Sequence, residues 1–165
     1  MRRGAATRAG GALAATAAAV LILDRLTKWL VVEAMDLRSV GVIEVWPGFV
    51  SLRMAWNRGM NFGILSSDLD FARWGLAGLA AAISIGVAVW ALRRGQRWFS
   101  LGAGALIGGA LGNAWDRVQH GAVADFLNVT CCGVVNPFAF NVADVAIFAG
   151  AAALAFAPHP AAHRA

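Results

Sequence analysis

The sequence predicts an all-α membrane protein with four transmembrane helices and a small β-structured segment on its outer (periplasmic) face. Hydrophobic residues make up 59% of the 165 residues and charged residues only 14%, whereas soluble domains are about half apolar and about a quarter charged. The chain contains seven Trp and no Tyr, and Trp is enriched at membrane interfaces. Several apolar stretches approach the length of about 20 residues that a helix needs to cross a bilayer.

The predicted spans lie within a single domain, residues 1–165, near residues 11–32, 71–92, 99–115 and 138–156. The basic residues before the first apolar run also fit a cleavable signal peptide. That run continues past Asp24 and Lys28, however, and charges kept inside a span usually serve a function. We therefore expect a retained first helix.

The distribution of Lys and Arg predicts the orientation, because these residues are enriched in cytoplasmic loops. With four spans, three basic regions lie on the same side: the N-terminus, the connection at residues 93–98 and the C-terminal tail. Both termini are therefore expected in the cytoplasm, and residues 33–70 and 116–137 are expected outside. The net charge of +5 is explained by this topology, so no nucleic-acid partner is predicted.

The first outer connection contains two strand-like runs, residues 40–46 and 49–56, on either side of a Pro47-Gly48 turn. Such a pattern predicts a small β-structure lying on the outer surface. Its apolar residues are suited to packing on the helices or touching lipid. An ordered but inert loop fits the same pattern.

Gly104, Gly108 and Gly112 recur every four residues in the third span. A stripe of small residues lets a neighbouring helix approach closely, so we expect these glycines to serve packing. Cys131 and Cys132 are adjacent, and neighbouring residues rarely reach disulfide geometry without strain. They are expected to be ordinary apolar residues or free thiols. Because neither they nor the histidines show metal-ligand spacing, no metal is predicted.

Polar residues in or beside the spans are functional candidates, because burying them in a membrane is costly. They form four groups, at residues 24–28, 57–63, 112–126 and 140–144. The predicted topology places all four groups at one level, near the outer ends of the spans.

Two carboxylates at one level suggest the chemistry of an aspartic protease. Like charges a few ångströms apart share one proton, so one acid can act as a base on water while the other polarises a carbonyl. Asp144 needs a partner if it is buried. The residues alone leave that partner open among Asp24, Asp116 and Asp125.

Structural roles compete with these functional ones. Asp24 and Lys28, four residues apart on one helix face, fit a structural intramembrane pair. Asp116 and Arg117 fit an interfacial cap and ion pair. Asn113 and Asn141 fit hydrogen bonds between helices.

The polar groups resemble the lipoprotein signal peptidase (signal peptidase II) family of membrane aspartic peptidases, over nearly the whole chain. Five segments are similar to the family's motifs, in order: Asp-x-x-Thr-Lys at 24–28, Asn-x-Gly at 57–59, Gly-Asn-x-x-Asp-Arg at 112–117, Val-x-Asp-Phe at 123–126 and Phe-Asn-x-Ala-Asp at 140–144. Each motif alone is weak, but five in order are specific. The chain departs from the family at Met60 and Asn61, where Ala-Ala is frequent.

The resemblance implies that Asp125 and Asp144 are the catalytic pair. It further implies that a second set of residues shapes the site, holds substrate or supports the pair: Asn113, Arg117, Asn141, Asp24, Lys28, Asn57, Gly59 and Asp116.

The implied reaction is removal of the signal peptide from diacylglyceryl-modified bacterial prolipoproteins, by a cut just before the lipidated cysteine. It needs no cofactor. The implied partners are prolipoprotein substrates and membrane lipid, in the bacterial inner (plasma) membrane. Because the chain holds a complete pair of acids, it is expected to function as a monomer. The β-like segment before Asn57 is hypothesised to cover the substrate from outside.

Three other functions compete with this one. An ion-coupled transporter would show repeated halves and broken helices, and neither is evident. An assembly protein that uses the glycine stripe would tolerate loss of Asp125. A membrane aspartic peptidase of another kind would not depend on lipid in its substrate.

Overall fold

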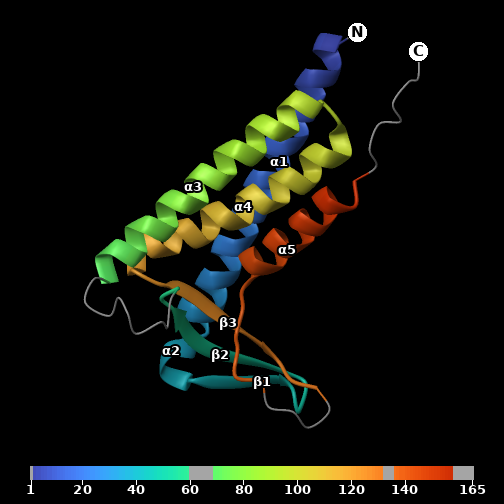
Figure 1. Ribbon diagram of the computed structural model, residues 1–165. Helices are drawn as coiled ribbons and strands as arrows, with labels where there is room; N and C mark the ends of the chain where they lie inside the picture. The colour runs from blue at the N-terminus through green and yellow to red at the C-terminus, as the bar shows by residue number, and fades with distance from the viewer. Residues whose placement is uncertain (1, 60–68, 132–135, 158–165) are drawn as a thin grey trace.

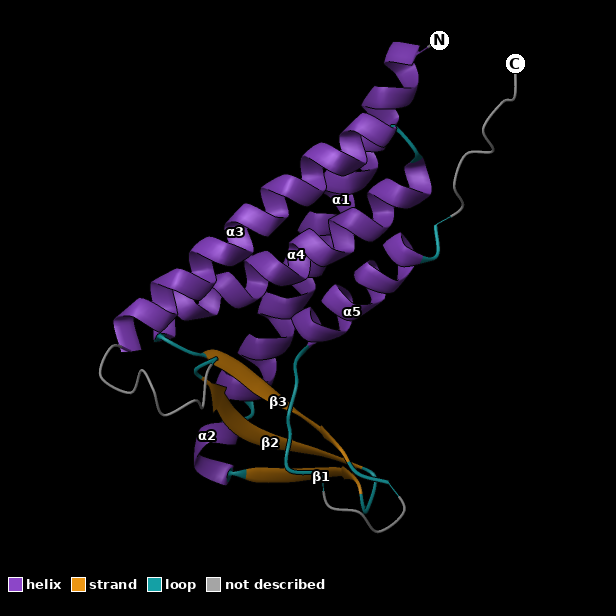
Figure 2. Cartoon of the chain, in the orientation of Figure 1, coloured by secondary structure: helices purple, strands orange, loops and turns teal. Residues whose placement is uncertain are grey.

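The structure is a computed structural model that describes residues 2–59, 69–131 and 136–157. Figures 1 and 2 show a bundle of helices with a small sheet at one end. The helices are α1 (Arg2–Lys28), α3 (Leu69–Arg94), α4 (Arg97–His120) and α5 (Val142–Ala155), and α1 continues into a π-helical segment, η1 (Trp29–Ala34). The fold is therefore mostly helical, with a β component.

A helix lies at the place of each predicted span, although the bounds differ. Within the described residues, Thr7–Ala34 and Ala72–Arg94 are long and apolar enough to cross a membrane. Helix α5 has only 14 residues and begins at Val142 instead of near residue 138, because Asn141 caps it there. Whether all four helices cross a membrane stays a prediction.

Helix α4 lies at the centre of the bundle and packs against α1, α3 and α5. The glycine stripe explains its contact with α1. A Cβ atom at Gly104 would lie 2.6 Å from the carbonyl oxygen of Leu13, and one at Gly108 would lie 2.5 Å from that of Ala17. The two backbones are thus closer than any side chain allows, which confirms that the stripe serves packing.

The sheet has three antiparallel strands in the order β1 (Val42–Trp46), β2 (Val50–Asn57) and β3 (Val123–Val129). Strands β1 and β2 confirm the predicted strand pair. Strand β3 corrects the expectation that residues 116–137 are only a connection. A short helix, α2 (Leu37–Val40), precedes β1. Its Leu37 packs under the sheet with Val31, Leu52 and Phe126 in one buried cluster.

Cys131, just beyond β3, is disulfide-bonded, so the expectation of a free thiol or a plain apolar side chain is wrong for this residue. Cys131 is exposed at the end of the sheet, where a thiol is open to oxidation. Cys132 lies outside the described residues.

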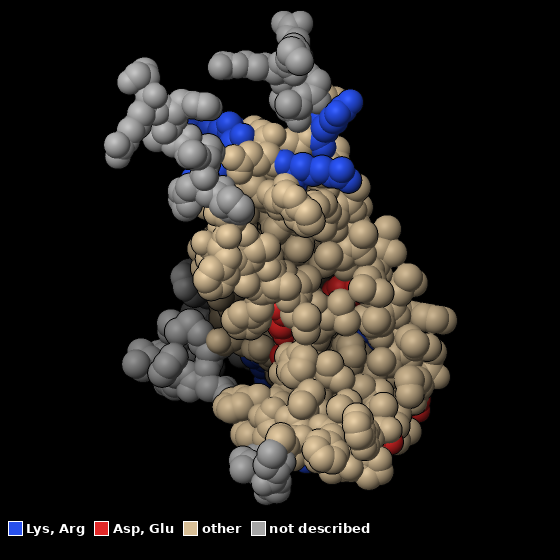
Figure 3. Space-filling model, turned by 90° about the vertical axis from the view of Figure 1, so that its right-hand side faces the viewer, with Lys and Arg blue, Asp and Glu red and all other residues tan. Residues whose placement is uncertain are grey.

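The two ends of the bundle differ in charge. The start of α1, the turn between α3 and α4 and the end of α5 lie at the end opposite the sheet (Figure 1). Figure 3 shows Lys and Arg gathered at that end, and acidic atoms inside a recess further down. The basic end matches the side predicted to be cytoplasmic.

Candidate active site

Strand β3 and the start of α5 are joined by backbone hydrogen bonds. The Leu127 N–H donates to the Phe140 carbonyl at 2.8 Å, and the Phe140 N–H donates back to Leu127 at 3.0 Å. The buried Asn128 side chain adds bonds to the carbonyls of Asn136 and Phe138. These contacts hold Asp125, on β3, and Asp144, in the first turn of α5, on neighbouring elements.

Asp125 is a buried carboxylate, only 3% exposed. Its Oδ1 accepts from the Asn141 Nδ2 at 2.6 Å, and its Oδ2 accepts from the Asn57 Nδ2 at 3.1 Å. Burial raises the pKa of Asp125 to about 6, and the nearby charge of Asp144 adds to the rise. Asp125 therefore holds a proton far more readily than an exposed aspartate.

The geometry of residues 57–59 explains the Asn-x-Gly motif. The Asn57 Oδ1 accepts from the Gly59 N–H at 2.9 Å, which leaves the amide nitrogen of Asn57 to face Asp125. Gly59 has a φ of 94°, in the region that favours glycine. A Cβ atom there would also collide with the side chain of Leu76. Met60 and Asn61 lie outside the described residues.

Asp144 is held by a capping box at the start of α5. Its Oδ2 accepts from the Asn141 N–H at 3.1 Å, while the Asn141 Oδ1 accepts from the Asp144 N–H at 3.0 Å. The Asn113 Nδ2 on α4 donates to the other Asp144 oxygen at 2.8 Å. The carboxylate itself is half-buried, so it is fixed in place and still reachable.

Asn141 links the two acids. Its side chain is fully buried and contacts both Asp125 and Asp144, and its Nδ2 also lies 3.2 Å from the Asn113 Oδ1. Asn113 and Asn141 therefore do bond between elements, as one alternative predicted. Since they also touch the two carboxylates, that structural role does not compete with a role in the site.

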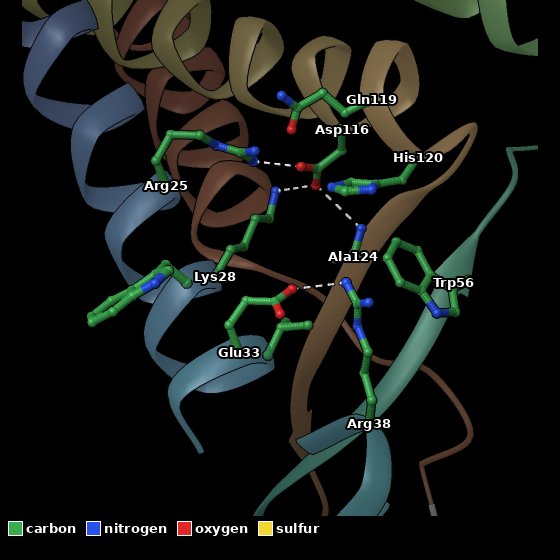
Figure 4. Close-up of a pocket in the computed structure, with 11 residues that line it drawn as sticks. Arg25, Lys28, Glu33, Arg38, Trp56, Asp116, Gln119, His120 and Ala124 are labelled. Atoms are coloured by element: carbon green, nitrogen blue, oxygen red, sulfur yellow. Dashed lines mark hydrogen bonds and ion pairs between the residues drawn. The ribbon is translucent and has the colours of Figure 1, made fainter. Parts of the chain in front are cut away.

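A second group of charges lies behind the pair of acids. Asp24 and Asp116 are 0% and 1% exposed. Arg25 lies 2.7 Å from Asp24 and 2.6 Å from Asp116, and Lys28 lies 3.0 Å and 2.6 Å from the same two carboxylates. We call these four residues the ion cluster, and Figure 4 shows its Asp116 half.

The ion cluster distinguishes Asp24 and Asp116 from Asp125 by the partners of their carboxylates. Asp24 and Asp116 each contact the same two cations, Arg25 and Lys28. Asp125 has amide partners instead, and its charge acts on that of Asp144. The expectation that Asp116 is an interfacial residue paired with Arg117 is wrong, because Asp116 is buried beside Arg25 and Lys28.

Arg117 projects from α4 beside the acids. Its Nη1 lies 3.4 Å from the Asn113 carbonyl, and its charge acts on both Asp125 and Asp144. Its Nε is buried and has no hydrogen-bond partner among the residues that the structure describes. A buried donor without a partner is costly, so Arg117 has the means to bind an additional acceptor.

An apolar groove of about 600 Å³ runs along α5 next to Asp144. Its lining consists of Phe140, Asp144, Val145, Phe148 and Ala149. Phe148 is 76% exposed, so the groove presents an apolar surface directly beside Asp144.

The site supplies acids and amides but no metal ligand set. Among the described residues, no group of three or more His, Cys, Asp or Glu side chains is placed to hold a metal ion. Two neighbouring carboxylates, of which one carries a raised pKa, can share one proton and act as a base and an acid on opposite sides of a reaction.

Comparison with known proteins identifies the family. The family model described as signal peptidase (SPase) II matches residues 16–158. The chain belongs to the signal peptidase II family.

Relatives and solved structures agree with this membership. A lipoprotein signal peptidase of Methylobacterium sp. (strain 4-46) is 40% identical over 85% of this chain and 84% of its own length. One of Caulobacter vibrioides is 38% identical over 90% of this chain and 86% of its own. A bacterial membrane enzyme solved at 1.9 Å resolution superposes with a TM-score of 0.73, at 28% identity, over 88% of this chain and 90% of that one.

All the residues that the signal peptidase II resemblance singled out lie in one connected region. They form the pair of acids, its amide and arginine neighbours, and the ion cluster. Arg25 is the member that the sequence prediction missed, although its place beside Asp24 inside an apolar span was a signal. The backbone N–H groups of Ala124 and Ala143 were missed as well, and no sequence motif marks them.

Proposed function

We propose that this member of the signal peptidase II family removes the signal peptide from diacylglyceryl-modified prolipoproteins, just before the lipidated cysteine, with Asp125 and Asp144 as its catalytic acids. The observation that carries the proposal is the shared partner Asn141, whose side-chain amide donates to the Asp125 carboxylate and whose backbone N–H donates to the Asp144 carboxylate, while the charge of Asp144 acts on Asp125. Two acids coupled in this way suit amide hydrolysis without a metal.

In the proposed reaction, one carboxylate takes a proton from water as the water attacks the scissile carbonyl. The other carboxyl donates its proton to the carbonyl oxygen, and a tetrahedral diol forms. Transfer of a proton to the amide nitrogen then releases the new amino terminus, and the C–N bond breaks. The raised pKa of Asp125, about 6, lets the pair hold one proton to a higher pH than an exposed aspartate would.

The polar neighbours have matching proposed roles. Asn113, Asn141 and Asn57 orient the carboxylates through their hydrogen bonds. Arg117 offers its Nε to a substrate carbonyl, a role supported by the lack of an acceptor for this buried donor within residues 2–59, 69–131 and 136–157. The groove along α5 is suited to an apolar residue of the signal helix or to an acyl chain, since Val145 and Phe148 line it.

The proposed placement is multi-pass in the bacterial inner membrane, with four spans and both termini in the cytoplasm. It is supported by the basic residues at one end of the bundle and by the exposed apolar side chains along the helices, for example Leu79, Ile83 and Phe148. The sheet and the acids would then lie near the outer face, next to lipid. The chain supplies both acids, so a monomer would be sufficient.

The test is cleavage of a purified, diacylglyceryl-modified prolipoprotein in detergent by wild type, Asp125→Asn and Asp144→Asn. Wild type should cleave, and each variant should lose about a thousandfold or more in kcat while staying folded, because an amide cannot hold the shared proton. Persistent cleavage by either folded variant would show that the pair is misassigned.

A second substrate that lacks the diacylglyceryl group separates the lipoprotein function from a broader one. Cleavage of the lipidated form alone is expected. Equal cleavage of both forms would still support a membrane aspartic peptidase, but it would show that the enzyme does not require lipid on its substrate.

A further inference from the structure

The buried ion cluster contacts the backbone immediately before each of the two acids. The Asp24 Oδ1 accepts from the Ala143 N–H at 3.2 Å, and Ala143 precedes Asp144. The Asp116 Oδ2 accepts from the Ala124 N–H at 3.2 Å, and Ala124 precedes Asp125 (Figure 4). The same relation thus occurs twice, on two different elements.

The position of each N–H group in its element suits a side-chain acceptor. Ala143 lies in the first turn of α5, where the backbone N–H groups have no carbonyl within the helix to donate to. Ala124 lies opposite Trp56 in the β2–β3 ladder, close to the irregularity between Leu52 and Ala55. Both residues are buried, at 0% and 4% exposure, so an unpaired N–H at either place would be costly.

The four charges of the ion cluster make a rigid bridge between the two contacts. Arg25 and Lys28 each touch both Asp24 and Asp116, and the formal charges cancel. A buried charge network of this kind is a poor source of stability compared with apolar packing, because desolvation offsets the attraction. Because the ion cluster lies directly behind both acids, we expect it to serve the geometry of the site instead of stability.

We propose that Asp24 and Asp116 are positioning residues, which hold Ala143 and Ala124 so that Asp144 and Asp125 stay at a fixed separation. Arg25 and Lys28 each contact both positioning carboxylates and balance their charge. This inference rests on the proposed function, since a fixed separation matters for acids that share a proton. An error of about 1 Å in such a site costs about a hundredfold in rate.

The pocket in front of the ion cluster does not by itself indicate a ligand. It has a volume of about 240 Å³ and is lined by Arg25, Lys28 and Arg38, among others. The first two cations are matched by Asp24 and Asp116, and Arg38 is paired with Glu33 at 2.9 Å. The charges in this pocket are therefore already satisfied within the protein, which favours a positioning role.

The decisive experiment compares two double variants, Arg25→Met/Asp116→Asn and Arg25→Met/Asp116→Ala. Both remove one charge of each sign, so Asp24 and Lys28 stay balanced in each. They differ in whether residue 116 still offers an oxygen to the Ala124 N–H. Removing Arg25 also means that the NH2 group of the asparagine introduced at position 116 does not face a cation.

The asparagine double variant should keep kcat within about fivefold of wild type, and the alanine one should lose about a hundredfold in kcat with KM nearly unchanged. The pH dependence of kcat should also change in the alanine variant alone, because the coupling between the acids depends on their separation. Equal kcat values and equal pH profiles for the two double variants would overturn the proposal.

Two controls isolate positioning from stability. Glu33→Gln removes a carboxylate from the same pocket. Glu33 pairs with Arg38 and not with the backbone before either acid, so the kcat of this variant should equal that of wild type. Gly102→Ala introduces a Cβ atom 3.0 Å from that of Ala153, at the opposite end of the bundle. It should lower the unfolding temperature without changing kcat, and a matching fall in kcat would indicate a purely structural effect.

Amide hydrogen exchange in the wild-type protein tests the contacts without any substrate. The N–H groups of Ala143 and Ala124 should exchange as slowly as the core of α4, even though Ala143 lies in the first turn of a helix. Fast exchange at both would refute the positioning contacts even if the enzyme is active. Slow exchange in a chain that cleaves no prolipoprotein would leave the contacts standing and refute the proposed function instead.

Discussion

Asn57 acts on the acidity of Asp125 through a single hydrogen bond. Its Nδ2 donates to Asp125 at 3.1 Å while its own oxygen is held by the Gly59 N–H. A donor to the charged form of a carboxylate lowers its pKa, and Asn57 thereby limits the rise that burial causes at Asp125. The residue is thus a means of setting the pH range of the pair.

Asn57→Ala should shift the alkaline limb of the kcat/KM profile to higher pH. Loss of the donor raises the pKa of Asp125 further above about 6, so the last shared proton leaves the free enzyme at a higher pH. The measurement is kcat/KM for the lipidated substrate across the pH range. Asn136→Ala is the matched control, because that amide donates to the Val129 carbonyl and contacts neither acid. An alkaline limb that stays in place, or moves to lower pH, would contradict the assignment.

At the scale of elements, the contact between α1 and α4 depends on glycine at positions where backbone meets backbone. The Cβ atom of an alanine at 108 would lie 2.5 Å from the Ala17 carbonyl oxygen and 2.8 Å from the Val20 Cβ. Neither neighbour is the end of a flexible side chain, so the helices themselves must separate.

Gly108→Ala should destabilise the protein by about 1–3 kcal/mol, the usual cost of overpacking. Thermal unfolding in detergent is the measurement. Gly86→Ala on α3 is the control, because nothing lies within 4 Å of the added atom and alanine favours a helix by about 1 kcal/mol over glycine. A Gly108→Ala protein as stable as Gly86→Ala would mean that the helices do not pack this closely.

The elements differ in how far the sequence could predict them. The long helices follow from apolar runs, and β1 and β2 follow from two strand-like runs around Pro47 and Gly48. Strand β3 was missed because Val123–Val129 reads as a connection until its partner is known. Its pairing with β2 joins residues about 70 positions apart, such as Trp56 and Ala124, and local patterns carry no signal for such distant contacts.

The site was predicted through its motifs, and its internal arrangement was not. Charge and burial alone left Asp24, Asp116 and Asp125 as equal partners for Asp144. The distinction depends on which acids meet cations, and that depends on how α1 rotates against α4. The start of α5 at Val142 was likewise unpredictable from apolar content, since the capping box of Asn141 and Asp144 sets it.

At the scale of the whole molecule, charge and apolar surface predict one orientation. Arg93, Arg94 and Arg97 lie at the turn between α3 and α4, and the sheet lies at the other end of the bundle (Figure 1). Exposed aromatic residues lie near both ends, for example Trp29 at 60% and Trp98 at 80% exposure. Aromatic side chains in these positions are typical of two membrane interfaces.

Thiol labelling of intact cells tests this orientation. In Ser39→Cys the thiol lies on exposed α2, and in Gln96→Cys it lies in the turn between α3 and α4. A membrane-impermeant thiol reagent should label residue 39 in cells with a permeable outer membrane, and residue 96 only after lysis. The parent chain, with Cys131 and Cys132, provides the background. The reverse pattern would invert the proposed topology.

Helix α5 has a consequence for where water meets lipid. Its 14 residues span about 21 Å at 1.5 Å per residue, whereas the hydrocarbon core of a bilayer is about 30 Å thick. If α5 crosses the membrane as proposed, the bilayer around it would be thinner than usual, and thinning at the start of the helix would bring water to its first turn. Asp144 lies in that first turn, so it would lie where the thinned bilayer meets water. Hydrolysis could then take place in water at this thinned part of the bilayer, while the apolar signal helix and the acyl chains of the substrate stay in the hydrocarbon core.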